Sequence, residues 1–217
     1  MCEIRLLFPV HMRTFFQDDT WQSGLEEIRV RVGQPIEFCY GSDNCYLTGK
    51  EKEQMFCSEK DYRRWEKDLY HATEADLREM LNYISNYSLY AYKEEIKQGY
   101  ITIEGGHRVG VAGQTVLVDG KIAGISPITF LNIRIAHEKC GCARKILPLI
   151  RQRDSIYNTL ILSMPGAGKT TLLRDSIRAL SNGEAYGIRL KVCVVDERSE
   201  IAASFHGVPQ NDMGPRT

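Results

Sequence analysis

Alternating apolar and polar residues mark two short stretches near the start of the chain. Residues 28–32 alternate isoleucine and valine with arginine, and residues 36–40 alternate again after a Gly-Gln-Pro turn at 33–35. A period of two is typical of half-buried strands, so the pattern predicts a β-hairpin. Residues 1–23 show no clean period, and we assign no element to this N-terminal segment.

Apolar residues spaced as on one face of a helix follow further along the chain. Thr73 and Asp76 have the spacing of a capping box, and apolar residues then recur every three to four positions over 77–84. These positions predict a helix over residues 74–98, with a break near Asn86.

Strand patterns return after residue 98. Residues 100–104 and 130–136 alternate, and Asp119-Gly120 lies between two β-prone runs, which is a strong hairpin signal. The glycine-rich stretch 105–113 lacks the G-x-G-x-x-G spacing, so we interpret it as a strand with close backbone approach rather than a phosphate loop. Together these elements predict an α+β N-terminal domain over residues 24–138.

A second domain is expected after a basic segment. Residues 139–156 carry five Lys or Arg residues and a proline, which favours a short helix and a linker. An apolar, β-prone run at 159–162 then precedes a loop, and an amphipathic helical pattern follows over 172–180. Residues 157–217 are therefore predicted to hold a strand–loop–helix unit.

The loop between that strand and helix carries the clearest chemistry in the sequence. Its pattern is close to G-x-x-x-x-G-K-[ST], the phosphate-binding loop, although serine replaces glycine at the first position. Nine residues form the candidate nucleotide site: Ser163, Met164, Pro165, Gly166, Ala167, Gly168, Lys169, Thr170 and Thr171.

Each residue type in this loop has a physical reason. Gly166 and Gly168 allow the backbone to turn so that N–H groups face phosphate oxygens, and the helix dipole adds positive potential. Lys169 can reach the β- and γ-phosphates, and the Thr170 hydroxyl can ligate Mg²⁺. The loop therefore predicts ATP and Mg²⁺ as cofactors.

A second apolar run, 191–195, ends in two acidic residues. Carboxylates at the C-terminal end of a buried parallel strand face the ligand crevice. Asp196 is a candidate to hold Mg²⁺ through water, and Glu197 to activate the attacking water. Two alternatives stay open: the pair caps the strand end or pairs with Arg198, or the metal-binding strand lies beyond residue 217.

The predicted fold class is α/β: an α+β domain followed by a P-loop NTPase βαβ core with a parallel sheet, truncated at its C-terminus.

Composition narrows the class of partner. The 217 residues are 43% hydrophobic and 26% charged, with 28 Lys and Arg balancing 28 Asp and Glu. This zero net charge gives no support to direct nucleic-acid binding. No stretch approaches 18 apolar residues, and seven cysteines without a C-x-x-C pair favour reduced thiols. We expect a cytoplasmic protein, peripheral to a membrane at most.

Five segments in combination resemble the stage III sporulation protein AA family. They are LEEIRVRVGQP (25–35), GGHRVG (105–110), LNIRIA (131–136), VVDERSEIA (194–202) and GVPQNDMGPRT (207–217). The resemblance implies an ATPase of endospore-forming bacteria, similar to the hexameric motors of type II and type IV secretion. It implies a mother-cell location and membrane-protein partners that form a channel complex at the forespore membranes.

The same resemblance assigns roles to individual residues. It implies that Glu197 is the catalytic glutamate of the acidic box after the loop's helix, and that Arg108 and Arg134 approach nucleotide phosphate. It also implies a further C-terminal portion that holds a later metal-binding strand. Two other functions stay open: a nucleotide-binding switch or scaffold that does not hydrolyse ATP, and a small P-loop kinase.

Overall fold

A computed structural model describes the chain except residues 1–3, 17, 50–54, 153–154, 185–186 and 198. The chain divides into two compact units, Met1–Ala136 and His137–Thr217.

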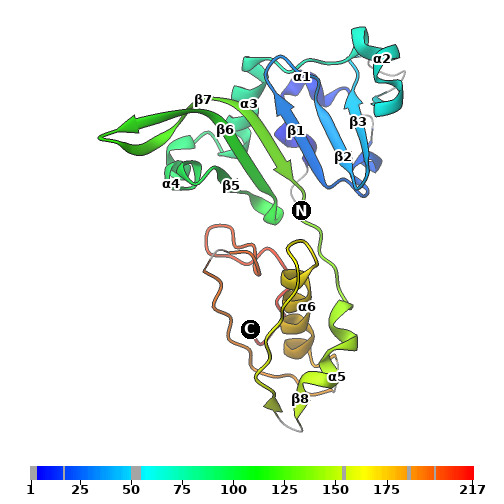
Figure 1. The fold of residues 1–217 in the computed structure, drawn as a ribbon, viewed down its shortest axis with the longest axis vertical. Coiled ribbons are helices and arrows are strands. Elements are labelled where there is room, and N and C mark those ends of the chain that lie inside the picture. Colours follow the sequence, from blue (N-terminus) through cyan, green and yellow to red (C-terminus); the bar gives the residue numbers. More distant parts are fainter. Residues whose placement is uncertain (1–3, 17, 50–54, 153–154, 185–186, 198) are drawn as a thin grey trace. The chain divides into compact units, whose positions relative to one another are not determined.

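The first unit is built on a seven-stranded antiparallel sheet (Figure 1). Its spatial order is β4-β3-β2-β1-β7-β6-β5, so the middle strand β1 pairs with β7 from far along the chain. The strands are β1 (Glu27–Arg31), β2 (Glu37–Tyr40), β3 (Asp43–Leu47), β4 (Phe56–Ser58), β5 (Tyr100–Thr102), β6 (Arg108–Val118) and β7 (Lys121–Arg134). The predicted hairpin is confirmed as β1 and β2, with Ile28 opposite Phe38.

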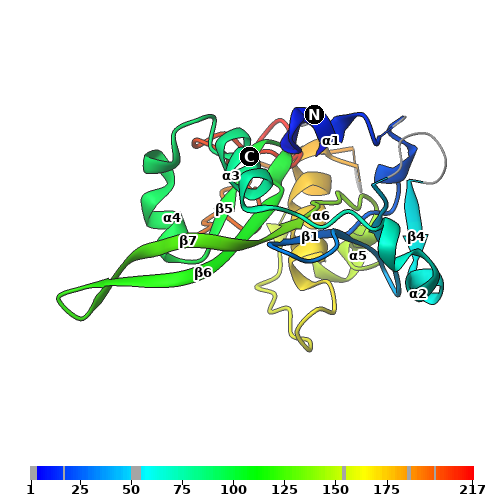
Figure 2. The same ribbon diagram turned by 90° about the horizontal axis from the view of Figure 1, so that it is seen from above.

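Helices cover one face of this sheet (Figure 2). The longest is α3 (Glu74–Ile84), and its Leu77 and Met80 are almost fully buried together with Ile28 and Leu131 of the strands. Aromatic rings near the N-terminus fill the rest of this core, as Phe8 does against Phe38 at a centroid distance of 6.1 Å. The remaining helices of the unit are short: η1 (Ile4–Leu7), α1 (Val10–Arg13), η2 (Thr20–Gln22), η3 (Glu59–Asp61), α2 (Tyr62–Trp65), η4 (Glu66–Asp68), η5 (Leu89–Tyr92), α4 (Lys93–Lys97) and η6 (Glu104–Gly106).

The predicted helix over 74–98 is interrupted where the sequence indicated. Thr73 and Asp76 form the capping box, with the Asp76 amide donating to Thr73 Oγ1 at 3.2 Å. Helix α3 ends at Ile84, and Asn86 takes a φ of 48°, a left-handed conformation that cannot continue the helix.

Strands β6 and β7 form a long hairpin that extends beyond the sheet (Figures 1 and 2). Its turn is Asp119-Gly120, as predicted, and both residues have positive φ, which matches the twist of the flanking strands. The glycine-rich stretch 105–113 lies largely in β6, so its interpretation as a strand is confirmed.

The second unit packs short elements against one helix. Helix α6 (Lys169–Asn182) contacts η7 (Cys142–Lys145), which leads into α5 (Leu147–Ile150), and the short strands β8 (Arg151–Gln152) and β9 (Ser155–Ile156) follow. Their shared core contains Ala143, Leu147, Ala179 and the flanking Ile146, Ile150, Leu172 and Leu180. Ala143, Ile146, Leu147 and Ile150, from the segment predicted as a short helix and linker, therefore pack against α6.

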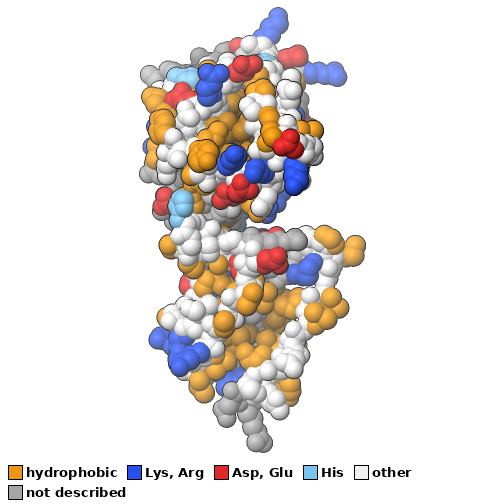
Figure 3. Space-filling view, turned by 90° about the vertical axis from the view of Figure 1, so that its left-hand side faces the viewer, with side chains coloured by type: hydrophobic (Ala, Val, Ile, Leu, Met, Phe, Trp, Pro, Cys, Tyr) orange, Lys and Arg blue, Asp and Glu red, His pale blue; other side chains and the backbone are white. Residues whose placement is uncertain are grey.

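The predicted parallel sheet is not found in the described residues. Residues 159–162 and 191–195 run without regular secondary structure, and no backbone hydrogen bond joins them. The apolar runs fit buried strands, but a strand forms only against a neighbour that takes its N–H and C=O groups. Leu160, Leu162 and Val195 are instead 79%, 80% and 90% exposed, and Figure 3 shows hydrophobic side chains gathered on this unit. The chain is mixed α and β with an antiparallel sheet.

Candidate functional site

The loop before α6 has the backbone that its glycines predict. Gly166 and Gly168 have φ of 77° and 85°, a left-handed region that other residues enter at a cost. Gly168 is the residue before the first turn of α6, which begins at Lys169. The loop and the helix start are therefore where the sequence placed them.

Several amides at this helix start have no backbone hydrogen-bond acceptor in the part of the chain that the structure describes. Within the described residues, no backbone acceptor takes the N–H groups of Gly166, Gly168, Lys169 or Thr170. The first N–H groups of a helix lack partners inside the helix, and here no side chain caps them either. Unpaired amides at the positive end of a helix dipole are suited to an anion with several oxygens.

Lys169 folds over the loop that precedes it. Its Nζ donates to the carbonyl oxygens of Met164 at 2.9 Å and Ser163 at 3.0 Å, and lies 3.3 Å from Ser163 Oγ. Serine at the first motif position thus contributes both a carbonyl and a hydroxyl to the lysine. Thr170 and Thr171 follow on the first turn of α6, and Met164 is 78% exposed at the loop's edge.

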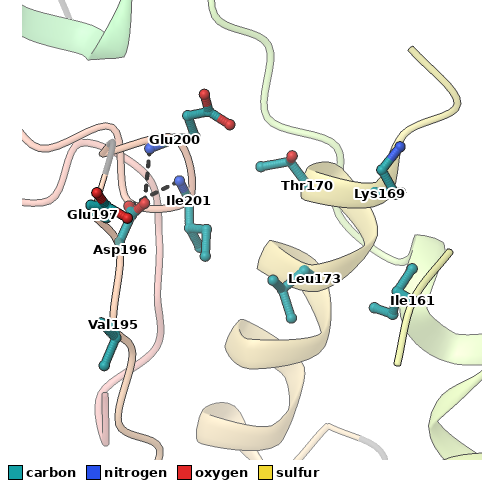
Figure 4. Close-up of a pocket in the computed structure, with 9 residues that line it drawn as sticks. All are labelled: Ile161, Lys169, Thr170, Leu173, Val195, Asp196, Glu197, Glu200 and Ile201. Atoms are coloured by element: carbon teal, nitrogen blue, oxygen red, sulfur yellow. Dashed lines mark hydrogen bonds between the residues drawn. The ribbon is translucent and has the colours of Figure 1, made fainter. Parts of the chain in front are cut away.

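Two cavities meet at Lys169. One, of about 490 Å³, is lined by loop residues 163 and 166–169 and by His137, Lys139 and Cys142. The other, of about 320 Å³, lies between α6 and the acidic turn and is lined by Thr170, Asp196, Glu197 and Glu200 among others (Figure 4). Both volumes fall in the range of small-molecule sites.

Asp196 organises the acidic turn. Its Oδ1 accepts the Glu200 amide at 3.0 Å, and its Oδ2 accepts the Ile201 amide at 2.9 Å (Figure 4). The same Oδ2 accepts the Ala202 amide at 2.9 Å. A carboxylate has about four acceptor positions, so one is left for another ligand. The capping role that the sequence left open for this acidic pair is thus present, and it belongs to Asp196.

Glu197 and Glu200 are the exposed carboxylates of the same turn. Both line the cavity with Thr170, and neither carboxylate makes a hydrogen bond or ion pair to another described residue. Figure 4 shows Thr170 directed toward the side of α6 that the turn faces, whereas Lys169 is directed toward the other side. Arg198, considered as a partner of this pair, lies outside the described residues.

Arg174 holds the acidic turn against α6. Its Nε donates to the carbonyl oxygen of Ile201 at 2.6 Å, and its Nη2 donates to that of Glu200 at 2.8 Å. Sequence reasoning missed this residue, because an arginine on an amphipathic helix ordinarily indicates a solvated face.

A buried ionic cluster supports α6 from within. Asp175 is 2% exposed, accepts the Ala143 amide at 2.7 Å, and accepts Arg178 Nη2 at 2.7 Å. Burial by itself raises the pKa of Asp175, but the amide of Ala143 and the guanidinium of Arg178 outweigh it, and the pKa falls to about 2. Arg178 also pairs with Glu184, which raises the pKa of the guanidinium.

Arg108 and Arg134 belong to the first unit. They lie directly opposite each other on β6 and β7, and both line a cavity with Tyr100 and Asn132. The structure therefore brings these two candidate residues together, and it places the candidate loop and the acidic turn together in the second unit.

The described residues show few other chemical groupings. They contain no cluster of three or more His, Cys, Asp or Glu side chains arranged to hold a metal ion, and their six cysteines are free. None of the helices in the described ranges is long and apolar enough to cross a membrane.

The second unit combines a glycine-rich loop before α6 with an acidic turn that Arg174 holds against the same helix. This arrangement defines a mixed α/β protein with a candidate anion site. The chain belongs to the family described as sporulation stage III, protein AA, whose match covers residues 2–217. It is 38% identical over 218 residues to stage III sporulation protein AA of Bacillus subtilis (strain 168). The match covers all of this chain and 64% of that relative. No solved structure matches the chain significantly.

Proposed function

We propose that the chain binds Mg²⁺-ATP at residues 163–171 and belongs to an ATPase that energises a channel complex during sporulation. The observation that carries the proposal is the set of amides of Gly166, Gly168, Lys169 and Thr170, which have no backbone acceptor among the described residues and lie next to the Lys169 ammonium. This donor set fits a polyphosphate, because it supplies several N–H groups and a cation within one turn of backbone.

Individual residues have distinct roles in the proposal. The loop amides would hold phosphate oxygens, Lys169 would leave the Ser163 and Met164 carbonyls to meet the β- and γ-phosphates, and the Thr170 hydroxyl would ligate the metal. Asp196 keeps one acceptor position for a metal-bound water after its three amide contacts. Bound Mg²⁺-ATP supplies the phosphoanhydride bond that is broken.

Glu197 is the proposed base. Its exposed carboxylate lines the cavity with Thr170, is held near the helix by the Arg174 clamp, and has no competing partner among the described residues. A free carboxylate on this cavity is placed to accept a proton from the attacking water.

The wider architecture is part of the same proposal. Residues 159–162 and 191–195 become strands of a parallel sheet when a further strand pairs with them, which also covers Leu160, Leu162 and Val195. The chain spans about 64% of the relative it matches, so such a strand, a hexameric assembly, the mother-cell location and the channel partners are proposals about a whole protein. In that assembly Arg108 and Arg134 approach nucleotide phosphate.

Release of inorganic phosphate from ATP, measured without any phosphoryl acceptor, tests whether the protein is an ATPase. We expect Glu197→Gln to keep ATP affinity and to lower turnover by about a hundredfold or more, the size expected for loss of a general base. Glu200→Gln is the matched control, since it removes a neighbouring exposed carboxylate of the same turn. ATP binding without turnover in the unaltered protein would favour the switch or scaffold. ADP formation that requires a phosphoryl acceptor would favour a kinase.

A further inference from the structure

Strand β6 has one edge without a partner strand over its last seven residues, 112–118, which we call the β6 edge. On the opposite side β6 pairs with β7 along its whole length. On the free side β5 pairs only with residues 108–110, and the last contact is the Val111 amide, which donates to the carbonyl oxygen of Gly99. Among the described residues, no backbone group outside the hairpin bonds to the β6 edge. Such an edge is a template for pairing with another strand.

The side chains of the β6 edge are exposed as well as its backbone. All seven residues are exposed, in the part of the hairpin that extends beyond the sheet (Figures 1 and 2). Three consecutive apolar residues lie among them: Val116, Leu117 and Val118 are 40%, 62% and 57% exposed. An isolated two-stranded hairpin is marginally stable in water, and a third strand adds both hydrogen bonds and apolar cover.

The two edges of the hairpin differ in their protection against pairing. Proteins commonly shield a strand edge with charges, prolines or bulges. Strand β7 has all three: Lys121, Pro127, which has no N–H to donate, and the extra residue at each of three irregularities in the β6–β7 register. The β6 edge, AGQTVLV, has no charge and no proline, and β6 runs through all three irregularities without an extra residue. The hairpin is therefore shielded against pairing along β7 but not along β6.

A second copy of the same edge matches it in length and in charge. The free stretch is bounded by the contact at Val111 and by the Asp119-Gly120 turn. Antiparallel pairing about a two-fold axis at Thr115 aligns all seven residues of one copy with all seven of the other. Because none of the seven is charged, no like charges lie opposite each other in this register.

We propose that the β6 edge pairs with the β6 edge of a second copy of this chain, antiparallel and centred on Thr115, so that the two hairpins form a four-stranded ribbon. Seven residues from each copy make a small interface, so the dimer is weak and its amount depends on concentration. The contact lies wholly within the first unit and does not depend on nucleotide binding at Lys169. A two-fold contact is also distinct from the head-to-tail contacts that close a ring.

Charged residues at position 115 test the pairing and its register together. Thr115 lies opposite its own copy, so Thr115→Lys places two lysines side by side and Thr115→Glu places two glutamates side by side. Sedimentation of the whole chain without nucleotide, in a Lys169→Ala background, measures dimerisation apart from any assembly that ATP drives. We expect each variant alone to dimerise about tenfold more weakly, and an equal mixture of the two to recover the dimer, because like charges directly opposite destabilise a strand pair and opposite charges stabilise it.

Ile122→Lys is the matched control on the other strand of the hairpin. Ile122 is 55% exposed and lies opposite Leu117 in the β6–β7 register, so the variant adds the same charge to the hairpin without touching the β6 edge. It should leave dimerisation unchanged. Amide hydrogen exchange provides a second measurement: exchange within residues 112–118 should become slower as the concentration of the unaltered chain rises, since paired N–H groups are protected. Thermal unfolding of each variant checks that the sheet is intact.

Three results would overturn the proposal: sedimentation of the unaltered chain as a monomer at every concentration, a dimer that persists in both Thr115 variants, or a mixture of the two variants that stays monomeric. Equal loss of the dimer in Ile122→Lys would also overturn it, because the hairpins would then pack through their faces rather than through the β6 edge. Recovery of the dimer only in the mixture, with Ile122→Lys unaffected, is the result that edge pairing predicts.

Discussion

Arg174 of helix α6 donates a 2.6 Å hydrogen bond from Nε to the carbonyl oxygen of Ile201. With the second bond to Glu200, this contact ties the acidic turn to the helix that starts at Lys169. Because the turn has little regular structure of its own, the position of Glu197 relative to Thr170 depends on this side chain.

Arg174→Ala should therefore loosen the turn and leave the helix folded. Hydrogen bonds from a charged donor contribute about 1.5 to 3 kcal/mol, so we expect amide exchange at Glu200, Ile201 and Ala202 to become faster by about tenfold or more. Amide hydrogen exchange measured by NMR checks this, with Arg144→Ala on η7 as the control. Unchanged exchange at the three amides would show that Arg174 does not hold the turn.

Asp175 should give the second unit an acid-sensitive stability. Its pKa is about 2 in the folded chain against an ordinary aspartate value of 3.8, so its contribution to the free energy of unfolding is complete above about pH 4 and is lost as the pH falls toward 2. At about 1.4 kcal/mol per pH unit, the contribution is about 2 kcal/mol.

Asp175→Asn should remove that contribution at neutral pH. We expect the free energy of unfolding to fall by about 2 kcal/mol at pH 7, with the difference from the unaltered chain shrinking below about pH 4. Both tryptophans, Trp21 and Trp65, lie in the first unit, so urea titrations must be followed by NMR signals of α6. Glu104→Gln is an exposed control. A stability difference that persists to pH 2 would contradict the assigned pKa.

Alanine substitutions at Gly168 and Gly120 give a test variant and a matched control for the role of the loop backbone. Both have positive φ, 85° and 73°, and neither would place a Cβ within 4 Å of another group. Replacement by alanine costs about 1 to 2 kcal/mol of backbone strain at either position. Gly168→Ala should lower ATP affinity by about tenfold, since relief of the strain moves the amides, whereas Gly120→Ala at the hairpin tip should leave it unchanged. Equal affinities in the two variants would exclude a role for the loop backbone.

The elements that could be predicted from sequence are those whose signals are local. The alternation at 28–32, the Asp119-Gly120 turn, the Thr73–Asp76 capping box and the loop before Lys169 each depend on a few neighbouring residues. Short-range steric and hydrogen-bond preferences are enough to specify them.

Other features require the tertiary structure. The runs at 159–162 and 191–195 indicate burial on both faces but not which segment pairs with them, so the predicted parallel sheet is missing from the described residues. The facing of Arg108 and Arg134 follows from the β6–β7 register, which the bulges after Ala112 do not affect at that end. The burial of Asp175 depends on the Ala143 amide, which lies 32 positions away.

The central claim is that the loop before α6 binds a nucleotide, and ATP affinity with and without Lys169 tests it most directly. Titration of the chain with Mg²⁺-ATP should show that Lys169→Ala weakens binding by about tenfold or more, equivalent to about 1.4 kcal/mol, while Lys145→Ala on η7 has no effect. ATP affinity that is the same in the unaltered chain and in Lys169→Ala, or no binding to the unaltered chain at all, would contradict the account.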